Sequence, residues 1–586
     1  MAESNKPTGY TPAQVPMERN LLIAFVLIGA VMFISQTFFA PAPQPKKAAT
    51  GSTAPAAAAS PSTPTPPAAA ENTKTTPPEA PAASAQASPN ATPQKVEPNF
   101  VIQTDLYRVE FSNQGGTVRS WKLRQYHGNT SEGKPDTKPL ELVNAAANLE
   151  YPFSLYFKET KPAVDVNWKW FKQTADPDNL GVTYEYSDGH IAVRKIFRFQ
   201  QHSYLTSVSS EVTQDGKPVP HLLEWRGGFG DFTVTTAAGN QRTMYFDVTN
   251  NKLVEQGAKA AASGPAAASG NFSFGGLGDN YFEAVFLAEN NASTQHITFA
   301  DHVKTPISDT AQAFTGVAVG DGPAGNKFDL FVGPKDLDLL NKINPKLTQT
   351  VDFGWLGVLA RPLFLIVNLV NSQFVHSFGW SIVLVTIAIN FALFPLKLSS
   401  MKSMKKMQAL KPQIDAINNK YKGVSIRDPK KADQNQEVMD LYKKHGVNPA
   451  GGCLPMLLQV PFFIAFYKVF TVSVEMRQAA WLWVPDLSQA EPWGIKALPI
   501  IMIASQFLMQ KMTPQAAGVD PAQQKMMQFM PLIFGFMFYQ FPSGLVLYYL
   551  TSNLVGMLQQ WFFNKTSLAT VAAQSVLPPP KKNGRK

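Results

Sequence analysis

Residues 377–407 read SFGWSIVLVTIAINFALFPLKLSSMKSMKKM, an apolar run followed directly by a basic segment. The run at 377–396 contains no ionisable residue. It is long enough to cross the hydrocarbon core of a bilayer, which takes about 20 helical residues. The following segment, 397–448, holds twelve basic residues against five acidic ones, a net charge of +7. Cytoplasmic loops carry such an excess of lysine and arginine. The stretch therefore predicts a transmembrane helix that leads into a cytoplasmic loop.

Further apolar segments predict a multi-span α-helical membrane protein with six transmembrane helices. Besides 377–396, the predicted spans lie at 20–40, 452–474, 495–512, 525–541 and 543–563. The first span is predicted to remain as an anchor, because cleavage after Ala40 would place bulky Phe38 where a signal peptide needs a small residue. We expect residues 1–19 in the cytoplasm, and six spans return the tail to the same side. That tail, 564–586, carries a net charge of +5, as the positive-inside rule requires.

Three segments of different character separate the first span from the second. Residues 41–98 hold 14 of the 46 prolines and almost no large apolar side chains, so we expect a semi-extended tether. From 99 to 345 the pattern has period two, as in Tyr107, Val109 and Phe111. Short apolar runs bounded by Gly, Asn and Asp favour a large periplasmic β-sandwich domain. Residues 346–376 include Arg361 and Pro362, and we expect them to lie along the membrane interface.

Composition excludes several classes of site. A single cysteine, Cys453, rules out a disulfide framework and cysteine-based metal sites, and the eight histidines form no HExxH motif. We therefore expect no metal, no cofactor and no enzyme active site. The Gly clusters GGFGDF (227–232) and GGLGDN (275–280) lack the strand–helix context of a dinucleotide site and are interpreted as turns. The Ala-, Ser- and Gly-rich stretch 259–270 predicts a loop.

The charge distribution favours a membrane-surface or ribosome partner over DNA. The two basic segments together exceed the net charge of +10 of the whole chain, and both flank apolar spans. Within 397–448, methionines and lysines alternate at helix-like spacing before a break at 423–429, which predicts a basic helical hairpin. The residues expected to contact the ribosome are Lys402, Lys405, Lys406, Lys581, Lys582, Arg585 and Lys586.

Polar residues inside the predicted spans are the strongest functional signal. Thr386, Asn390 and Lys397 are four and seven residues apart, so they share one face of a straight helix. Such residues usually face a partner or a watery cavity. A hydrophilic groove within the bilayer is one interpretation. Hydrogen bonds between packed helices are the alternative for the uncharged residues, as is snorkelling to the interface for Lys468. The predicted groove residues are Thr386, Asn390, Lys397, Gln459, Tyr467, Lys468, Ser505 and Gln506.

Several long motifs resemble the YidC/Oxa/Alb family of membrane protein insertases, in its Gram-negative form. They include NPAGGCLP (448–455), QVPFFIAFY (459–467), SVEMRQA (473–479), QQKMMQFMP (523–531) and FPSGLVLYYLTSNLVGMLQQ (541–560). The resemblance covers nearly the whole chain outside the tether. It implies an insertase and chaperone for nascent inner-membrane proteins, acting alone or beside the Sec translocon, with ribosome contacts and a periplasmic supersandwich. It also implies a location in the bacterial inner membrane.

One departure from the family concerns the groove. The family usually has an arginine where Asn390 stands and an aromatic residue where Lys468 stands. Judged by depth along two antiparallel straight helices, the Lys468 ammonium approaches the level of Asn390, whereas Lys397 lies about 10 Å nearer the cytoplasm. We therefore hypothesise that Lys468 supplies the charge of the groove.

Two other classes of function fit the sequence less well. A secondary transporter would also have intramembrane polar residues, but it should show repeated halves, and no such repeat is visible in this sequence. A membrane-anchored carbohydrate-binding or carbohydrate-active protein would account for a large β domain. It would not account for the basic cytoplasmic hairpin.

Overall fold

The computed structural model describes residues 95–144, 149–159, 161–288, 293–305, 308–320, 325–424, 428–448, 454–513, 529, 532 and 535–575. The predicted N-terminal segment, the first span and residues 41–94 of the tether lie outside these ranges. So do residues 525–528, 530–531 and 533–534 of the predicted 525–541 span, and Lys581, Lys582, Arg585 and Lys586 of the tail. The chain divides into two compact units. One contains the basic hairpin, Leu398–Leu454. The other contains the β domain together with the remaining described helices.

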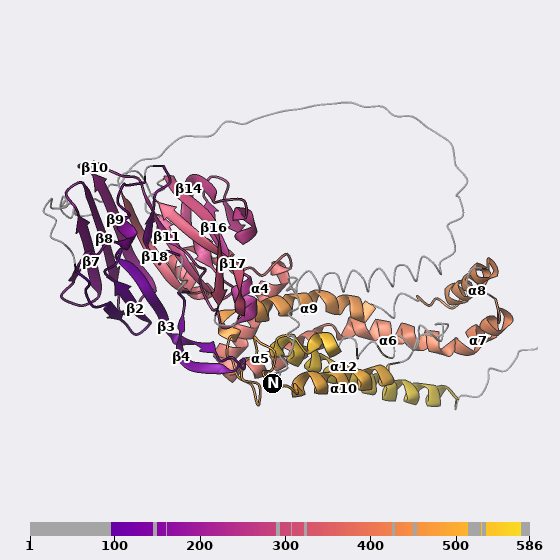
Figure 1. Ribbon diagram of the computed structural model, residues 1–586. Coiled ribbons are helices and arrows are strands. Elements are labelled where there is room, and N and C mark those ends of the chain that lie inside the picture. Colours follow the sequence, from indigo (N-terminus) through magenta and orange to yellow (C-terminus); the bar gives the residue numbers. More distant parts are fainter. Residues whose placement is uncertain are drawn as a thin grey trace, which may run out of the picture. The chain divides into compact units, whose positions relative to one another are not determined.

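The residues from 100 to 334 form a β domain, drawn in indigo to magenta in Figure 1. A four-stranded sheet has the order β1-β2-β3-β4, and a fourteen-stranded sheet has the main path β5-β11-β17-β16-β14-β15-β18-β9-β8-β7-β6. Within the described residues all strand pairs are antiparallel. The strands are β1 (Phe100–Gln103), β2 (Tyr107–Ser112), β3 (Thr117–Asn129), β4 (Pro135–Glu141), β5 (Ser154–Tyr156), β6 (Lys172–Ala175), β7 (Gly181–Ser187), β8 (Ile191–Phe199), β9 (Leu205–Gln214), β10 (Lys217–Pro218), β11 (Leu222–Trp225), β12 (Arg242–Asp247), β13 (Lys252–Gln256), β14 (Ala266–Gly278), β15 (Phe282–Ala288), β16 (Ser293–Thr305), β17 (Ser308–Gly320) and β18 (Asn326–Pro334).

Aromatic side chains join the two sheets. Tyr107 and Trp121 of the smaller sheet pack edge-on or tilted against Phe199 of β8, with ring centroids 6.0 and 5.6 Å apart. Both side chains are fully buried. Large rings remove 150–250 Å² each from water, so a few of them stabilise a sandwich core. The period-two prediction is confirmed here, because β2 and β9 alternate buried and partly exposed positions.

The predicted loop at 259–270 is partly wrong. Ala266 begins β14, which pairs with β16 through Ala266–Asn271. Small side chains do not prevent a strand when a neighbour supplies the backbone hydrogen bonds. The sequence pattern did not reveal that neighbour.

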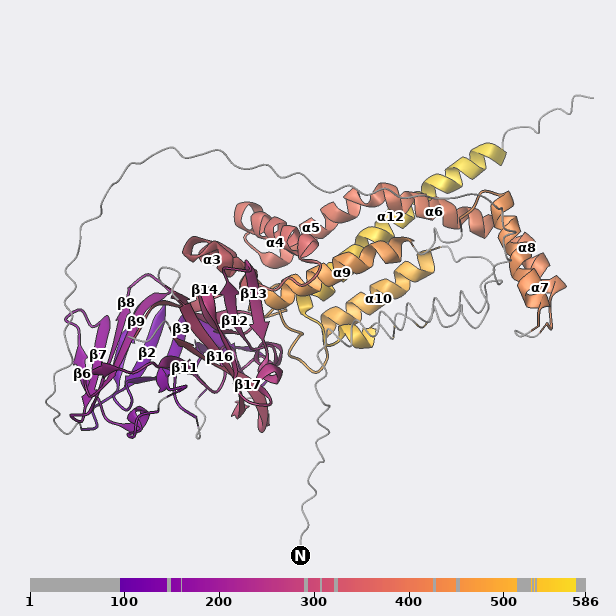
Figure 2. The ribbon, with the colours of Figure 1, turned by 90° about the horizontal axis from the view of Figure 1, so that it is seen from above.

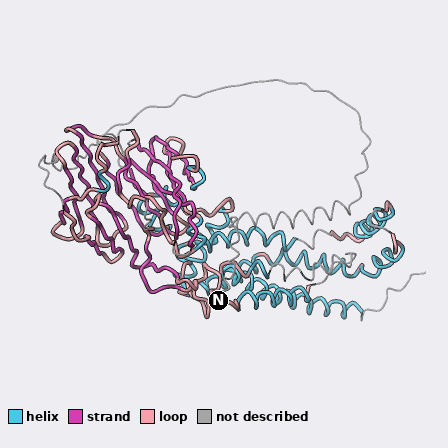
Figure 3. Tube along the Cα trace, viewed as in Figure 1, coloured by secondary structure: helices cyan, strands magenta, loops and turns pink. Residues whose placement is uncertain are grey.

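The C-terminal half of the described chain is helical, as the colours of Figure 3 show. Helices α10 and α12 pack together, and α12 also packs on α5 (Figure 2). The helices are α2 (Thr235–Gly239), α3 (Leu337–Ile343), α4 (Gly357–Val370), α5 (Phe378–Ala392), α6 (Phe394–Ala409), α7 (Lys411–Lys420), α8 (Lys430–Lys444), α9 (Leu454–Val472), α10 (Ala497–Met512) and α12 (Ser543–Ser575).

The predicted span 377–396 is not one straight helix. It comprises α5 and the first turn of α6, and the two helices meet at a bend of 58°. Pro395 has no backbone N–H, so the carbonyl of Phe391 loses its helical partner. The next carbonyl back, that of Asn390, instead accepts a hydrogen bond from the Gln559 side chain of α12 at 3.2 Å. A proline and an inserted side chain are recognised causes of sharp kinks.

Length and composition alone identify few clear membrane spans among the described helices. Gly357–Val375 is long and apolar enough to cross a bilayer, and α5 with α6 is a second candidate if the bent pair is one span. The apolar segments Leu457–Val472 and Ala497–Met512 are shorter. Gly357–Val375 lies within residues 346–376, which the sequence predicted to lie along the membrane interface.

The basic hairpin has its own small core. Met407, Leu410, Ile414, Tyr442 and Val447 are buried together, and Met404 packs against them. The methionines that alternate with lysines therefore belong to a hydrophobic face, while Lys402 and Lys406 are exposed. The hairpin break near 423–429 is confirmed, since α7 ends at Lys420 and α8 begins at Lys430.

Candidate functional site

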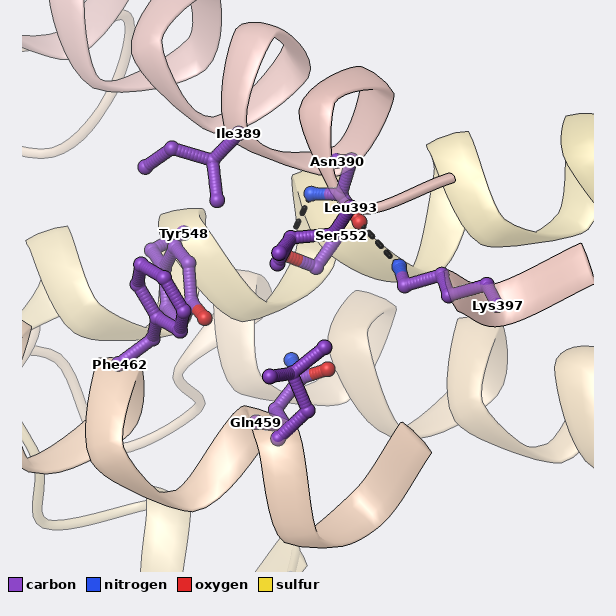
Figure 4. Close-up of a pocket in the computed structure, with 9 residues that line it drawn as sticks. Ile389, Asn390, Leu393, Lys397, Gln459, Phe462, Tyr548 and Ser552 are labelled. Atoms are coloured by element: carbon purple, nitrogen blue, oxygen red, sulfur yellow. Dashed lines mark hydrogen bonds between the residues drawn. The ribbon is translucent and has the colours of Figure 1, made fainter. Parts of the chain in front are cut away.

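A small pocket lies between the helices α5, α9 and α12 and the first turn of α6. Figure 4 shows polar groups of Asn390, Lys397, Gln459 and Ser552 among apolar side chains. The lining residues are Ile389, Asn390, Leu393, Lys397, Leu458, Gln459, Phe462, Tyr548 and Ser552. Three of the predicted groove residues, Asn390, Lys397 and Gln459, thus meet at one place.

Asn390 connects three elements at this pocket. Its Oδ1 accepts a hydrogen bond from Lys397 Nζ at 2.6 Å, and its Nδ2 donates to the Ser552 hydroxyl of α12 at 3.3 Å (Figure 4). The same amide donates to the backbone carbonyl of Thr386 at 2.8 Å. Because an asparagine oxygen is an acceptor and an ammonium is only a donor, the pair orients the asparagine without ambiguity. The bend at Pro395 turns Lys397 back towards Asn390.

Thr386 does not line the pocket. Its side chain is fully buried, and its hydroxyl donates to the carbonyl of Ile382 one turn earlier, at 2.6 Å. It supports the pocket indirectly through its own carbonyl, which holds the Asn390 amide. Local back-bonding of this kind is common for threonine within helices.

Ser505 and Gln506 lie at a helix contact away from the pocket. The Ser505 hydroxyl accepts a hydrogen bond from Asn553 Nδ2 of α12 at 2.9 Å and donates to Met502 O. The Gln506 Oε1 atom is buried and has no hydrogen-bond partner among the residues that the structure describes. Ser505 therefore makes a hydrogen bond between two packed helices, α10 and α12, which was the alternative to a place in the groove.

Lys468 does not reach the pocket, so the hypothesis about its geometry is wrong. Its ammonium lies 3.5 Å from the Asp352 carboxylate, and its side chain is 13% exposed. Nine residues separate Lys468 from Gln459, which at 100° per residue amounts to 900°, two full turns and a further half turn. Lys468 therefore lies on the face of α9 opposite the pocket. The hypothesis considered depth along the helix and ignored this rotation. Tyr467 is also outside the pocket and packs against Phe541, with centroids 5.8 Å apart.

Sequence reasoning missed the contribution of α12. Tyr548, Ser552 and Gln559 are spaced four and seven residues apart, the same pattern that singled out Thr386, Asn390 and Lys397. Ser552 and Gln559 both donate or accept hydrogen bonds at Asn390. Applying the same spacing argument to the last span would have found them. Among the described residues, no group of three or more His, Cys, Asp or Glu side chains is placed to hold a metal ion.

Comparisons with known proteins agree for both parts of the chain. Residues 99–366 match the family model of the YidC periplasmic domain, and residues 370–570 match that of the 60Kd inner membrane protein. The membrane protein insertase YidC of Syntrophus aciditrophicus is 32% identical over 94% of this chain and 100% of that protein. The corresponding protein of Geobacter metallireducens is 32% identical over 95% of this chain and 100% of its own length.

Solved structures give a weaker likeness. A crystal structure of an active YidC insertase with its first transmembrane domain resolved has 20% identity and a TM-score of 0.34, and the alignment covers 80% of this chain and 94% of that one. The two family models and the relatives define an inner-membrane protein with a periplasmic domain. The chain belongs to the YidC family of membrane protein insertases.

Proposed function

We propose that the pocket between α5, α9 and α12 is part of a hydrophilic groove through which this insertase moves polar segments of nascent inner-membrane proteins. The observation that carries the proposal is the Lys397–Asn390–Ser552 chain, which joins three helices among apolar side chains. An ionisable group inside a membrane domain is expensive, so it usually serves a substrate path or a polar cavity.

Lys397 is the proposed source of positive charge in this groove. Where relatives of this family carry an arginine, this chain carries Asn390, whose side-chain oxygen holds the ammonium of Lys397 at 2.6 Å. The positive charge thus lies seven residues, about two helical turns, after the position of the arginine. The bend between α5 and α6 brings it close to Asn390 again. Such a group attracts acidic side chains in the segment being moved, because charges interact strongly where little water screens them.

A hydrated groove lowers the cost of bringing polar residues into about 30 Å of hydrocarbon. Apolar segments of the same client then leave sideways into lipid, where they gain contact with the acyl chains. In this proposal hydrophobic partitioning drives the insertion step, and the groove residues only bind and orient the polar segment.

The wider arrangement is proposed as follows. The chain crosses the membrane six times with both termini in the cytoplasm, and α4 lies along the outer interface. Exposed aromatic side chains next to α4 and in the segment after α9 support this placement, because such residues are enriched at membrane interfaces; they are Trp355, Phe374, Trp483 and Trp493. Ribosomes are proposed to contact the basic hairpin and the C-terminal tail, and the Sec translocon to act beside the insertase for some clients.

The Lys397 assignment is tested by insertion of a radiolabelled client into proteoliposomes that contain the full chain. Lys397→Met should reduce insertion of a client with acidic residues in its translocated segment by about tenfold, the effect of losing roughly 1.4 kcal/mol of attraction. Lys397→Arg should retain most of the activity. Lys217→Met is the control, because this exposed lysine of β10 lies outside the groove, the basic hairpin and the C-terminal tail.

The choice of client makes the test specific. Replacing the acidic residues of the client by their amides should largely abolish the difference between Lys397→Met and the unmodified chain. An equal loss for acidic and neutral clients would argue against a charge-based role, and normal insertion of both would remove Lys397 from the groove.

A further inference from the structure

The two Gly-rich motifs of the β domain meet in space. The Asp279 carboxylate accepts hydrogen bonds from the backbone N–H groups of Asp231 at 2.6 Å, and of Tyr281 and Phe282 at 2.7 Å. Gly230 allows this approach, since it has φ +105° and a Cβ there would lie 2.3 Å from Asp279 Oδ2. These motifs therefore shape a loop that presents the Asp231 side chain.

Arg477, which follows α9, enters this loop. Its Nε donates to Asp231 Oδ2 at 3.1 Å, and its Nη2 contacts the same carboxylate and the carbonyl oxygen of His127. The side chains of Arg477 and Asp231 are 2% and 0% exposed. The neighbouring Gln478 amide donates to the His127 and Gly128 carbonyls at 2.9 and 3.1 Å. The segment after α9 is thus anchored to the β domain by a buried ion pair with surrounding hydrogen bonds.

The residues that follow Arg477 contact two other helices. Trp481 covers Gly379 at the start of α5, where a Cβ would lie 2.1 Å from the indole, and its ring packs on Trp380 at 5.6 Å. Farther on, the carbonyls of Leu487 and Gln489 accept hydrogen bonds from the first two N–H groups of α12, both at 2.8 Å. Residues 473–489 therefore connect the β domain to the ends of α5, α9 and α12.

A second ion pair joins α9 to the segment that precedes α4. Lys468, on the face of α9 opposite the pocket, is paired with Asp352, which lies in the segment between β18 and α4. Lys468 of α9 thus binds Asp352, and Arg477 in the segment after α9 binds Asp231 of the β domain. The helices reached in this way are those that line the pocket.

We propose that Arg477 is a positioning residue, which fixes residues 473–489 on the β domain and thereby holds the ends of α5, α9 and α12 in the arrangement that forms the groove. The proposal rests on the proposed function, because it gives a role in insertion to the relative placement of these three helices. In this proposal the GGFGDF and GGLGDN motifs form the binding site for the Arg477 side chain.

Hydrogen–deuterium exchange of the full chain in nanodiscs tests the anchoring. Arg477→Gln and Asp231→Asn each leave an unpaired or unmatched group in a buried site, which is strongly unfavourable. We expect exchange in peptides covering 479–490 and 541–548 to become at least about tenfold faster in both variants. The double variant should be less affected than Asp231→Asn, because no buried charge then lacks a partner. Arg477→Lys should lie between the double variant and the unmodified chain.

The control is Lys195→Met, which removes a buried ammonium that donates to the Gly115 and Phe153 carbonyls inside the β domain, at 2.6 and 2.7 Å. It should accelerate exchange within the strands but not in the two peptides. If Arg477→Gln fails to accumulate, Arg477→Lys and the double variant carry the test, since neither leaves a buried charge unpaired. Unchanged exchange of 479–490 and 541–548 in the Arg477 and Asp231 variants would overturn the anchoring.

The positioning role is tested by client insertion with the same variants. Insertion should fall in the order in which exchange rises. Faster exchange with normal insertion would overturn the role of Arg477 in the reaction. Failure of the groove itself is seen separately, as normal insertion by Lys397→Met while the exchange response to Arg477→Gln persists.

Discussion

Two lysines on apolar helices, Lys397 and Lys468, have opposite surroundings. Lys397 donates to Asn390 in the pocket, and Lys468 is paired with Asp352 on the far face of α9. Lys468 was predicted to serve the groove from its charge and its depth, which indicate that burial is costly but not where the side chain points. Rotation about the helix axis decides which partner meets each ammonium.

A single histidine gives a pH prediction for the β domain. His296 of β16 is fully buried, and burial lowers its pKa to about 4 from an ordinary 6.5. Between these values the unfolded chain binds a proton that the folded domain does not. The contribution of neutral His296 to stability is therefore complete above pH 6.5 and is lost as the pH falls towards 4.

His296→Gln removes this dependence. Relative to the variant, the unmodified chain should lose up to about 3 kcal/mol of unfolding free energy between pH 7 and pH 4. The measurement is the urea midpoint of the β-sheet circular dichroism signal at several pH values. The comparison isolates His296, because buried Glu224 and Glu283 titrate in both proteins. Parallel pH profiles for the two proteins would contradict the prediction.

At the scale of elements, the bend between α5 and α6 matters most for the site. In a straight helix, residues seven apart lie about 10 Å apart along the axis, too far for an easy contact between Lys397 and Asn390. The 58° bend brings the first turn of α6 closer, and Gln559 of α12 takes the carbonyl that the bend frees. The pocket is therefore a consequence of Pro395 as well as of the polar residues.

Pro395→Ala tests this dependence. Alanine restores the backbone N–H, so α5 and α6 should become more nearly continuous and Lys397 should move away from Asn390. We expect insertion of an acidic client to fall severalfold although every charge is retained. A disulfide scan or electron paramagnetic resonance distance between labels on α6 and α12 would report the movement. Pro362→Ala, another proline inside an apolar helix, is the control and should leave that distance unchanged.

At the scale of the whole molecule, the distribution of charge predicts sidedness. The hairpin and the tail carry the excess of positive charge, so we expect both in the cytoplasm and the β domain in the periplasm. In a chain whose Cys453 is replaced, Asp415→Cys should react with an impermeant maleimide only from the cytoplasmic side. Gln200→Cys should react only from the periplasmic side. Both positions are exposed, so a reversed pattern would invalidate the six-span arrangement.

The sequence by itself predicted the β domain, the basic hairpin and most positions of the described helices. These features follow from local patterns, namely period-two alternation, apolar length and charge, which do not depend on distant neighbours. It also predicted Asn390, Lys397 and Gln459 as groove residues, and these three line the pocket. Local spacing correctly placed the break between α7 and α8.

Only the tertiary structure decided which of these residues meet. Lys468 was assigned to the groove because depth can be counted along a sequence, whereas the rotation of one helix against another cannot. Likewise, Asp231 and Arg477 are 246 residues apart, and nothing local indicates that a Gly-rich turn receives an arginine from the segment after α9. Contacts of this kind depend on how whole elements pack, which local sequence patterns do not specify.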